Sequence, residues 1–413
     1  MIHTASKNRV AFPARAFFAA LGPILAAATM SAGSATAASE MVLYSFCQQA
    51  NCADGAFPGA GLIATTNGGL YGTTTQGGSA NAGVAFLVSI AGGHGILHAF
   101  QGSFNDGAAP AAPLFRDQSG NFYGTTSSAG PSSSGTIFKR SASGAYTLMH
   151  AFNGTDGSFP FAGLFADSAA NLFGTTTAGG AHGSGTIFRL TPSGTLTMLY
   201  SFCSTPGCPD GYDPVAGLTG DANGNLYGTA FSGGTGASGV VFKIHADGTN
   251  YTVLHSFRNG TDGAKPLAGL AAGPSGNLYG TTELGGANGS GTVFEIAPDG
   301  SNYAVLYSFC SLASCADGAE PGGGVILDAG GNLYGTALAG GAHNKGAVFA
   351  LTPSGTETVL YSFCSSSACA DGSNPIGNLV ALGPGTLYGT TASGGSMGAG
   401  TVYQLTDTGF VPQ

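Results

Sequence analysis

The chain is a succession of short apolar segments separated by clusters of Gly, Pro, Asn and Asp. One such series comprises residues 161–165, 172–176, 185–190 and 197–202, each five or six residues long and rich in β-branched and aromatic side chains. Helix-length patterns with a period of 3.6 residues are missing. The pattern therefore predicts an all-β fold of short strands joined by turns.

Two phrases recur in step along the chain. The aromatic-Gly-Thr phrase occurs seven times, 50 to 55 residues apart, beginning at Tyr71, Tyr123, Phe173, Tyr227, Tyr279, Tyr334 and Tyr388. The Asp-Gly-x-x-Pro phrase also occurs seven times, beginning at Asp54, Asp106, Asp156, Asp210, Asp262, Asp317 and Asp371. A repeat of about fifty residues that contains four short strands is typical of a β-propeller blade.

The repeats predict a single all-β domain over residues 38–413, a seven-bladed β-propeller with four antiparallel strands per blade. A β-solenoid is the alternative, but its coils are usually shorter and need capping ends. The chain begins its repeats with one lone strand, residues 41–46, and ends them after three strands, at residues 400–405. The N-terminal strand 41–46 would join those three strands, close the ring and protect its edges.

Loop lengths orient each blade. The Asp-x-x-Gly-Asn and Pro-x-Gly turns are tight, whereas the Gly-rich loop after Thr-Thr and the segment through Asp-Gly-x-x-Pro are longer. The longest connection should join the outer strand of one blade to the inner strand of the next, so the Ala-Gly-Leu strand that follows it is expected innermost. Because connections alternate between the faces of the ring, both long loops lie on one face. We expect ligand contacts on this long-loop face.

The first residues form a secretory signal. Lys7, Arg9 and Arg15 precede an apolar stretch, residues 17–32, and an Ala-x-Ala site ends at Ala37. Residues 1–37 are therefore predicted to be a signal peptide, with an uncleaved membrane anchor as the alternative. Cleavage leaves 8 basic and 20 acidic residues, a net charge of −12. This balance argues against nucleic acid as a partner, and no later segment resembles a membrane span.

All eight cysteines fall in Cys-x4-Cys pairs. The pairs are Cys47 with Cys52, Cys203 with Cys208, Cys310 with Cys315, and Cys364 with Cys369. They occur only where the loop before Asp-Gly is longest, eight residues from the preceding Phe to the Asp, against four to six in the other repeats. Local disulfides that pin extended loops in an exported protein explain this distribution. The competing interpretation is metal binding, which would require four thiolates to meet at one site.

Polar candidates on the long-loop face are few. The seven Asp-Gly aspartates could form a ring of carboxylates for cations or sugar hydroxyls, or each could stabilise its own turn. His182, Glu283 and His343 are the titratable residues of the Gly-Gly loops. His98, His150 and His255 stand where other repeats have Tyr44, Tyr200, Tyr307 and Tyr361. No motif indicates a metal, a cofactor or a nucleophile, so we assign no catalytic residue.

The repeat unit combines Leu-Tyr-Gly-Thr-Thr, Gly-Gly, Gly-Thr-Val-Phe and Val-Leu-Tyr-Ser-Phe, as in residues 278–286, 291–296 and 305–309. This unit resembles the bacterial tandem repeat called GloVer. The resemblance covers about residues 41–406. It implies an exported protein, often held at the cell surface by one of several C-terminal anchors, and it implies no established activity. This chain ends at residues 409–413 without an apolar tail or a basic stop. We therefore expect release into the periplasm or the medium.

Three hypotheses of function remain open. The first is a secreted, non-enzymatic binding or scaffold protein that contacts a glycan or a surface protein with its long-loop face. The second is a carbohydrate-active hydrolase or lyase, which would need unlike polar residues such as His182 and Glu283 to converge. The third is a structural component of the cell envelope. The sequence gives no indication of the oligomeric state.

Overall fold

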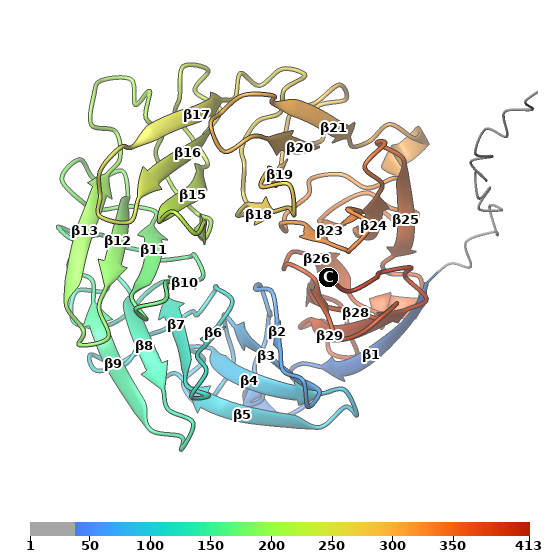
Figure 1. Ribbon diagram of the computed structural model, residues 1–413. Coiled ribbons are helices and arrows are strands. Elements are labelled where there is room, and N and C mark those ends of the chain that lie inside the picture. Colours follow the sequence, from blue (N-terminus) through green and yellow to red (C-terminus); the bar gives the residue numbers. More distant parts are fainter. Residues whose placement is uncertain (1–37) are drawn as a thin grey trace, which may run out of the picture. The chain divides into compact units, whose positions relative to one another are not determined.

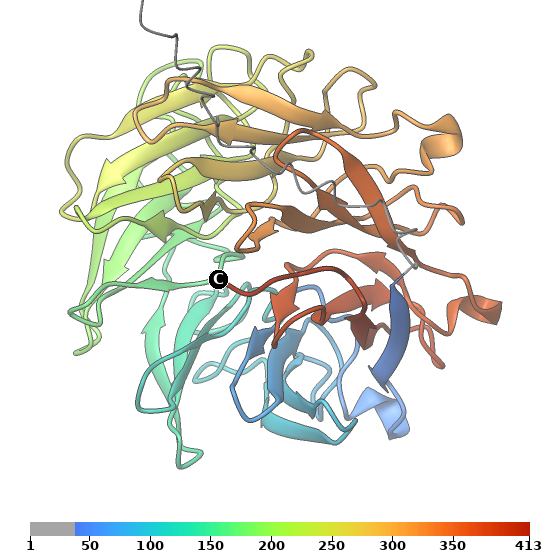
Figure 2. The same ribbon diagram turned by 45° about the vertical axis from the view of Figure 1, so that its right-hand side comes forward.

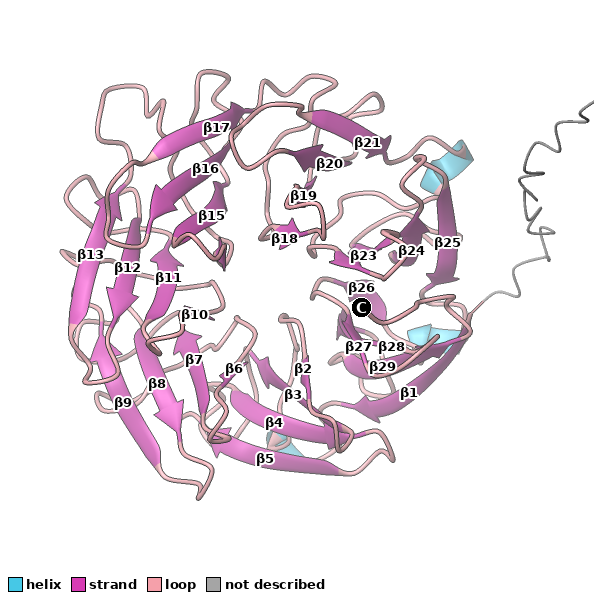
Figure 3. Ribbon diagram, viewed as in Figure 1, coloured by secondary structure: helices cyan, strands magenta, loops and turns pink. Residues whose placement is uncertain are grey.

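A computed structural model describes residues 38–413 and shows a ring of seven β-sheets around a central axis (Figure 1). Each sheet is one blade, and in blades 1 to 6 the strands follow one another outward in chain order (Figure 3). The predicted seven-bladed propeller is confirmed. The described part of the chain holds no helix of the length and apolar character that a membrane span requires.

The strands of the seven blades have the following bounds. From the axis outward, blade 1 has β2 (Ile63–Ala64), β3 (Gly69–Thr74), β4 (Val84–Ser89) and β5 (His94–Ala99); blade 2 has β6 (Phe115–Arg116), β7 (Phe122–Thr126), β8 (Thr136–Arg140) and β9 (Tyr146–Ala151); blade 3 has β10 (Phe165–Ala166), β11 (Leu172–Thr176), β12 (Thr186–Leu190) and β13 (Leu196–Ser201); blade 4 has β14 (Thr219–Gly220), β15 (Asn225–Ala230), β16 (Val240–His245) and β17 (Thr252–Ser256); blade 5 has β18 (Ala271–Ala272), β19 (Leu278–Thr282), β20 (Thr292–Ile296) and β21 (Ala304–Ser308); blade 6 has β22 (Ile326–Leu327), β23 (Leu333–Ala337), β24 (Ala347–Leu351) and β25 (Glu357–Ser362); and blade 7 has β27 (Val380–Ala381), β28 (Leu387–Ser393), β29 (Thr401–Thr406) and β1 (Ser39–Ser45), with β26 (Ser373–Pro375) also paired to β28.

Blade 7 is built from both ends of the described chain. β1 pairs antiparallel with β29, from Ser39 opposite Thr406 to Ser45 opposite Thr401. The predicted closure by an N-terminal strand is confirmed, with bounds that differ by one or two residues from 41–46. After β29 the chain crosses to blade 6, where the carbonyl of Val411 accepts a hydrogen bond from the N–H of Ala329 (Figure 2). Closure thus leaves β1 as the outer strand of its blade.

The glycine of each aromatic-Gly-Thr phrase makes room for an aromatic ring. A Cβ atom on Gly228 would lie 2.6 Å from the ring of Phe242, which stands opposite it in the strand ladder. The same crowding recurs in every blade, and in blade 7 the ring is that of Tyr403. These rings are almost fully buried and form the centre of each blade. Glycine is therefore required here by close approach rather than by backbone flexibility.

The threonine of the same phrase links each blade to the next. The buried Oγ1 of Thr229 donates to the carbonyl of Ala268 over 3.1 Å. The other six donate in the same way, and the series includes Thr390 to Ala60, which joins blade 7 to blade 1. Seven equivalent hydrogen bonds thus run around the ring. Because these carbonyls are buried, loss of the donor would leave each unsatisfied.

The Ala-Gly-Leu segments are innermost, but the hydrogen-bonded inner strands begin just after them. In blade 1 the segment is residues 60–62, whereas β2 is Ile63–Ala64. The predicted placement at the axis is right and the predicted strand bounds, such as 161–165 in blade 3, are wrong. The reason is crowding near the axis: a Cβ on Gly377 would lie 2.7 Å from the backbone of Ala60. The segments of neighbouring blades pack backbone against backbone there.

All four predicted disulfides are present, and no free cysteine remains among residues 38–413. Each bond closes the long loop between the outer strand of one blade and the Asp-Gly turn before the next. The metal-binding alternative is excluded for these thiols. The bonded pairs are Cys47 with Cys52, Cys203 with Cys208, Cys310 with Cys315, and Cys364 with Cys369.

The four disulfide loops differ in the turn before their second cysteine. Three contain a short 3-10 turn: η1 (Ala50–Cys52), η2 (Ala313–Cys315) and η3 (Ser367–Cys369). The loop that ends at Cys208 has a Pro-Gly turn instead, in which the N–H of Cys208 donates to the carbonyl of Thr205 at 3.0 Å. Gly207 takes the left-handed conformation there, with φ at 85°. The same loop length is thus closed by two kinds of turn.

Candidate functional site

The strand order places the two kinds of connection on opposite faces of the ring. The tight turns join the first strand of a blade to the second and the third to the fourth, so both lie on one face. The Gly-rich loops and the Asp-Gly segments lie on the other face, which is the long-loop face expected from the sequence.

The Asp-Gly aspartates are fixed inside this face by hydrogen bonds from their own loops. Asp54 is completely buried and accepts the Tyr44 hydroxyl at 2.7 Å and the backbone N–H groups of Gln48 and Gln49 at 2.9 and 3.1 Å. Asp210, Asp317 and Asp371 accept the corresponding hydroxyls of Tyr200, Tyr307 and Tyr361. In these loops a serine also donates its N–H and its hydroxyl to the same carboxylate.

Histidine replaces tyrosine in the three loops that lack a disulfide. His98 Nε2 lies 3.1 Å from Asp106, His150 Nε2 lies 2.9 Å from Asp156, and His255 Nε2 lies 3.3 Å from Asp262. Asp156 and Asp262 are half-buried, unlike the five other aspartates. The tyrosine or histidine therefore varies together with the loop length. The exchange of tyrosine for histidine and the change in loop length are both visible in the sequence. Only the structure shows that both affect the surroundings of the same carboxylate.

The hydrogen bonds determine the acidity of these carboxyls. For Asp371, burial acts to raise the pKa, but the Ser365 N–H and the Tyr361 hydroxyl outweigh burial and hold the pKa below its usual value. The same balance lowers the pKa of Asp210 and of Asp317. A carboxylate with such donors is stabilised in its charged form where it stands. Of the two interpretations of the Asp-Gly aspartates, this arrangement favours the one in which each carboxylate stabilises its own turn.

The three other sequence candidates lie apart from one another. His182 and His343 are exposed in the Gly-rich loops of blades 3 and 6. At the equivalent position of blade 5, Asn288 Nδ2 donates to the carbonyl of Phe309, so these loop tips reach toward the outer strands. Glu283 directly follows β19 and its N–H bonds to the carbonyl of Lys265, close to the axis. The structure therefore does not bring His182 or His343 together with Glu283.

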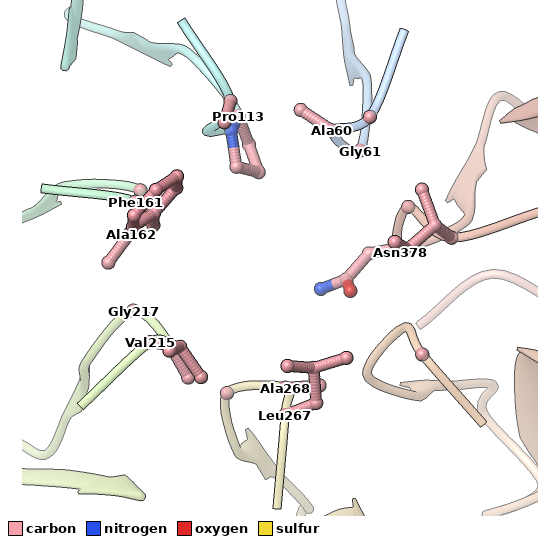
Figure 4. Close-up of a pocket in the computed structure, with 18 of the residues that line it drawn as sticks. Ala60, Gly61, Pro113, Phe161, Ala162, Val215, Gly217, Leu267, Ala268 and Asn378 are labelled. Atoms are coloured by element: carbon pink, nitrogen blue, oxygen red, sulfur yellow. The ribbon is translucent and has the colours of Figure 1, made fainter. Parts of the chain in front are cut away.

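An axial cavity of about 600 Å³ is lined by the inner segments of all seven blades (Figure 4). Its walls are small or apolar side chains, among them Phe161, Val215, Leu267 and Ile376. Asn378 is the polar exception, and it stands where most blades have the glycine of Ala-Gly-Leu. Its Oδ1 accepts the N–H of Gly324 at 2.7 Å while the side chain points into the cavity.

Two rings of residues lie on the long-loop face, and we call them together the channel mouth, because each member of the first ring stands two positions before a residue that lines the cavity. The first ring consists of the residues before the repeated proline: Phe57, Ala109, Phe159, Asp213, Lys265, Glu320 and Asn374. All seven have a left-handed backbone, with φ between 52 and 58°. The second ring consists of the residues that follow the Thr-Thr or Thr-Ala pair: Thr75, Ser127, Thr177, Phe231, Glu283, Leu338 and Ala392. In blades 1 to 6 each second-ring N–H donates to the first-ring carbonyl of its blade. The positions are thus equivalent in backbone and differ only in side chain.

One arc of the mouth, over blades 1 to 3, is aromatic. Phe57 and Phe159 of the first ring are 39% and 42% exposed, and Phe161 of the adjoining cavity wall is 42% exposed, although large apolar residues are usually buried. Beside them, the hydroxyls of Thr75 and Thr177 bond to the carbonyls of Phe57 and Phe159. This arc offers ring faces and hydroxyl oxygens to solvent.

The opposite arc, over blades 4 to 6, is charged. Lys265 Nζ lies 2.9 Å from Ser232 Oγ and 4.6 Å from the centre of the Phe231 ring. Among residues 38–413, no hydrogen bond or ion pair engages the carboxylates of Asp213, Glu283 and Glu320. Burial raises the pKa of Asp213, and the Lys265 charge opposes this rise. Burial and the negative charge of Glu320 raise the pKa of Glu283, again opposed by Lys265.

The mouth is the place where unlike polar residues from several blades converge. Only Glu283 of this set is among the residues predicted from the sequence. The sequence feature that could have indicated the other residues is the position directly before the proline of Asp-Gly-x-x-Pro. This position varies between repeats, whereas the Asp, Gly and Pro around it are repeated. Within the described residues, no group of three His, Cys, Asp or Glu side chains is arranged to hold a metal ion.

Solved structures of similar fold were found. A candidate 6-phosphogluconolactonase from Bacteroides fragilis is 18% identical with a TM-score of 0.50, and the match covers 79% of this chain and 89% of that one. A chain of a nidogen/laminin complex is 17% identical with a TM-score of 0.44, covering 72% and 91%. A gluconolactonase from Xanthomonas campestris is 15% identical with a TM-score of 0.41, covering 66% and 78%. At identities this low, the first likeness supports a shared fold, and none of the three says anything about activity.

Sequence comparison is more specific. No curated protein gave a match. The model of the Gloeobacter/Verrucomicrobia repeat matches residues 31–237 and 206–403, which together span nearly all of the repeats. The chain therefore belongs to the Gloeobacter/Verrucomicrobia repeat family, and the resemblance drawn from its repeated motif is confirmed.

Proposed function

We propose that this protein is an exported, non-catalytic glycan-binding propeller whose site is the channel mouth. The observation that carries the proposal is the two-sided mouth: one arc has exposed phenylalanines, and the other has carboxylates without a partner among the described residues. The repeated Asp-Gly carboxylates support a structural role instead, since each already accepts hydrogen bonds from its own loop.

The aromatic arc suits the apolar face of a pyranose ring. Phe57, Phe159 and Phe161 come from blades 1 and 3, so they present ring surface over more than one blade. Burial of aromatic surface is a main source of binding energy, and ligand sites are typically apolar with a few polar groups that fix orientation. The cavity volume lies within the usual range for such sites.

The charged arc suits the hydroxyl edge of the same ligand. Ionised carboxylates act only as acceptors, and each can take two hydroxyl donors. Asp213, Glu283 and Glu320 have this capacity free, whereas Lys265 is held by Ser232 and Phe231. The four disulfides support function outside the cytoplasm, where such bonds persist.

Isothermal titration of oxidised residues 38–413 with cellohexaose and chitohexaose tests this function. We expect one of these probes to bind, and Phe57→Ala with Phe159→Ala to weaken its binding about tenfold or more, because each ring contributes roughly 1 kcal/mol. Glu283→Gln with Glu320→Gln should also weaken binding. Phe104→Ala is the matched control, because Phe104 is 66% exposed on the same face but outside the mouth.

Two results would overturn the proposal. Binding that is insensitive to both double variants would move the site away from the mouth. Release of shorter sugars from either probe by the unmodified protein would show a hydrolase or lyase instead of a binding protein.

A further inference from the structure

We call the outer-strand tyrosine or histidine that bonds to the Asp-Gly aspartate of its loop the clasp residue, and the two together the clasp. Four residues before each clasp residue, the outer strand has a position that packs on the preceding blade. At four junctions it is aromatic and stacks on that blade's clasp residue. The stacked pairs, with ring-centre distances, are His94 on Tyr44 (4.2 Å), Tyr146 on His98 (4.1 Å), Tyr251 on Tyr200 (3.9 Å) and Tyr303 on His255 (3.7 Å). At the junction of blades 2 and 3 the residue is Leu196. The position is therefore normally filled by an apolar or aromatic side chain.

Glutamate occupies this position at two successive junctions. Glu357 in β25 faces the clasp of Tyr307 and Asp317, and Glu40 in β1 faces the clasp of Tyr361 and Asp371. Both side chains are half-buried, and the Oε1 atom of each is buried with no hydrogen-bond partner among residues 38–413. Each glutamate thus stands beside an aspartate that its own loop holds in the charged form.

A third departure from the repeat lies at the same place. The blade-centre ring of blade 7 is Tyr403, where the other six blades have phenylalanine. Tyr403 is fully buried, its hydroxyl has no hydrogen-bond partner in the described part of the chain, and the charge of Glu40 acts on it. The charged or titratable groups that face Glu40 are therefore Asp371, Tyr361 and Tyr403, and those that face Glu357 are Asp317 and Tyr307.

We propose that Glu40 and Glu357 form a pH-sensitive joint on the two sides of blade 6, which holds β1 tightly when they are protonated and loosens it when they are ionised. A protonated carboxyl can remain in this slot beside a carboxylate. An ionised one brings a second negative charge next to Asp371 or Asp317, and its buried Oε1 has no donor among residues 38–413. The Tyr361 hydroxyl favours the ionised form of Glu40, but burial and the charge of Asp371 outweigh it. Within the described residues, no basic side chain acts on either glutamate to compensate this charge.

The balance has a defined direction. Burial and the charge of Asp371 raise the pKa of Glu40 to about 7 against the opposing effect of the Tyr361 hydroxyl, and burial and the charge of Asp317 raise the pKa of Glu357 to about 8. An acid whose pKa is higher in the folded chain than in the unfolded chain binds more protons when folded, so its contribution falls as pH rises. The loosening therefore develops above the ordinary value of 4.5 and is complete near pH 8.

β1 is the element that should respond first. It pairs with one neighbour, β29, and lies at the outer edge of blade 7. Edge strands with one partner open locally at lower cost than central strands. Ionisation of Glu40 is thus expected to open the ring at its closure rather than to unfold all blades together.

Hydrogen–deuterium exchange at pH 5.5, 6.5, 7.5 and 8.5 tests the joint in oxidised residues 38–413. After correction for the intrinsic pH dependence of exchange, the protection of β1 amides should fall about tenfold or more over this range, because the pKa of Glu40 is raised from 4.5 to about 7. Glu40→Gln should abolish most of this fall, and Glu40→Gln with Glu357→Gln should abolish it fully. Asp299→Asn is the control, since hydrogen bonds from Ser301 keep the pKa of Asp299 below its usual value and the residue stays ionised throughout.

Retention of the full pH dependence in the double glutamine variant would overturn the proposal. If glutamine is not tolerated in the slot, Glu40→Tyr restores the aromatic residue of the other junctions and provides the same comparison. A β1 that shows equal protection at all four pH values in the unmodified protein would also contradict the joint.

Discussion

At the scale of single residues, the repeated phrases are explained by contacts that recur in every blade. The glycine of aromatic-Gly-Thr leaves room for a buried aromatic ring, and the threonine donates a hydrogen bond to a carbonyl of the next blade. The aspartate of Asp-Gly organises its own loop. The sequence could show that these residues repeat, but not whether a carboxylate faces solvent or its own backbone. That distinction depends on the Tyr44 hydroxyl and on N–H groups whose direction only the folded loop defines.

The aspartates should differ in their contribution to stability. Asp54→Ala removes the acceptor of three hydrogen bonds in a completely buried site and leaves the Tyr44 hydroxyl and two N–H groups unpaired. We expect a loss of about 2–4 kcal/mol in the free energy of unfolding, measured by urea denaturation.

Asp262→Ala is the matched control for this change. Asp262 is half-buried, and its N–H donors are longer, at 3.2 and 3.3 Å. A loss below about 1 kcal/mol is expected there. Equal losses in the free energy of unfolding at both positions would contradict the larger structural role that we assign to the buried Asp54 carboxylate.

At the scale of elements, strand order and loop classes followed from the sequence pattern, while the innermost strands did not. The apolar Ala-Gly-Leu run predicts a strand, but near the axis neighbouring backbones are too close for a ladder to begin there. Pairing starts directly after this run, as in β10 (Phe165–Ala166), which follows residues 162–164. The signal peptide predicted for residues 1–37 lies outside the described residues.

The disulfide loops are the elements whose contribution is most easily separated. Cys364→Ala with Cys369→Ala opens a loop with a sequence separation of 5, so only a small closure entropy is lost. We expect a destabilisation of about 1–2 kcal/mol by urea denaturation, with the strands of blade 7 retained. Unfolding of the whole ring on this single change would contradict a local role for the pair.

At the scale of the whole molecule, seven near-equivalent blades create a ring whose differences are concentrated at the mouth. Repetition made the ring predictable, because each phrase marks one blade. The mouth was not predictable in the same way, since Phe57, Phe159, Asp213 and Glu320 are far apart in sequence and share only their place before a proline. Closure of the ring brings them to one opening, and the side chains that break the repeat then define two unlike arcs.

Glycan binding at the channel mouth is tested most directly by hydrogen–deuterium exchange of residues 38–413 with and without a saturating hexasaccharide, cellohexaose or chitohexaose. We expect protection in the peptides that contain residues 57–62, 159–164 and 283–286, at the mouth on the long-loop face, and unchanged exchange in the tight turns of the opposite face. Protection confined to the tight turns, or no protection with either sugar, would contradict glycan binding at the channel mouth.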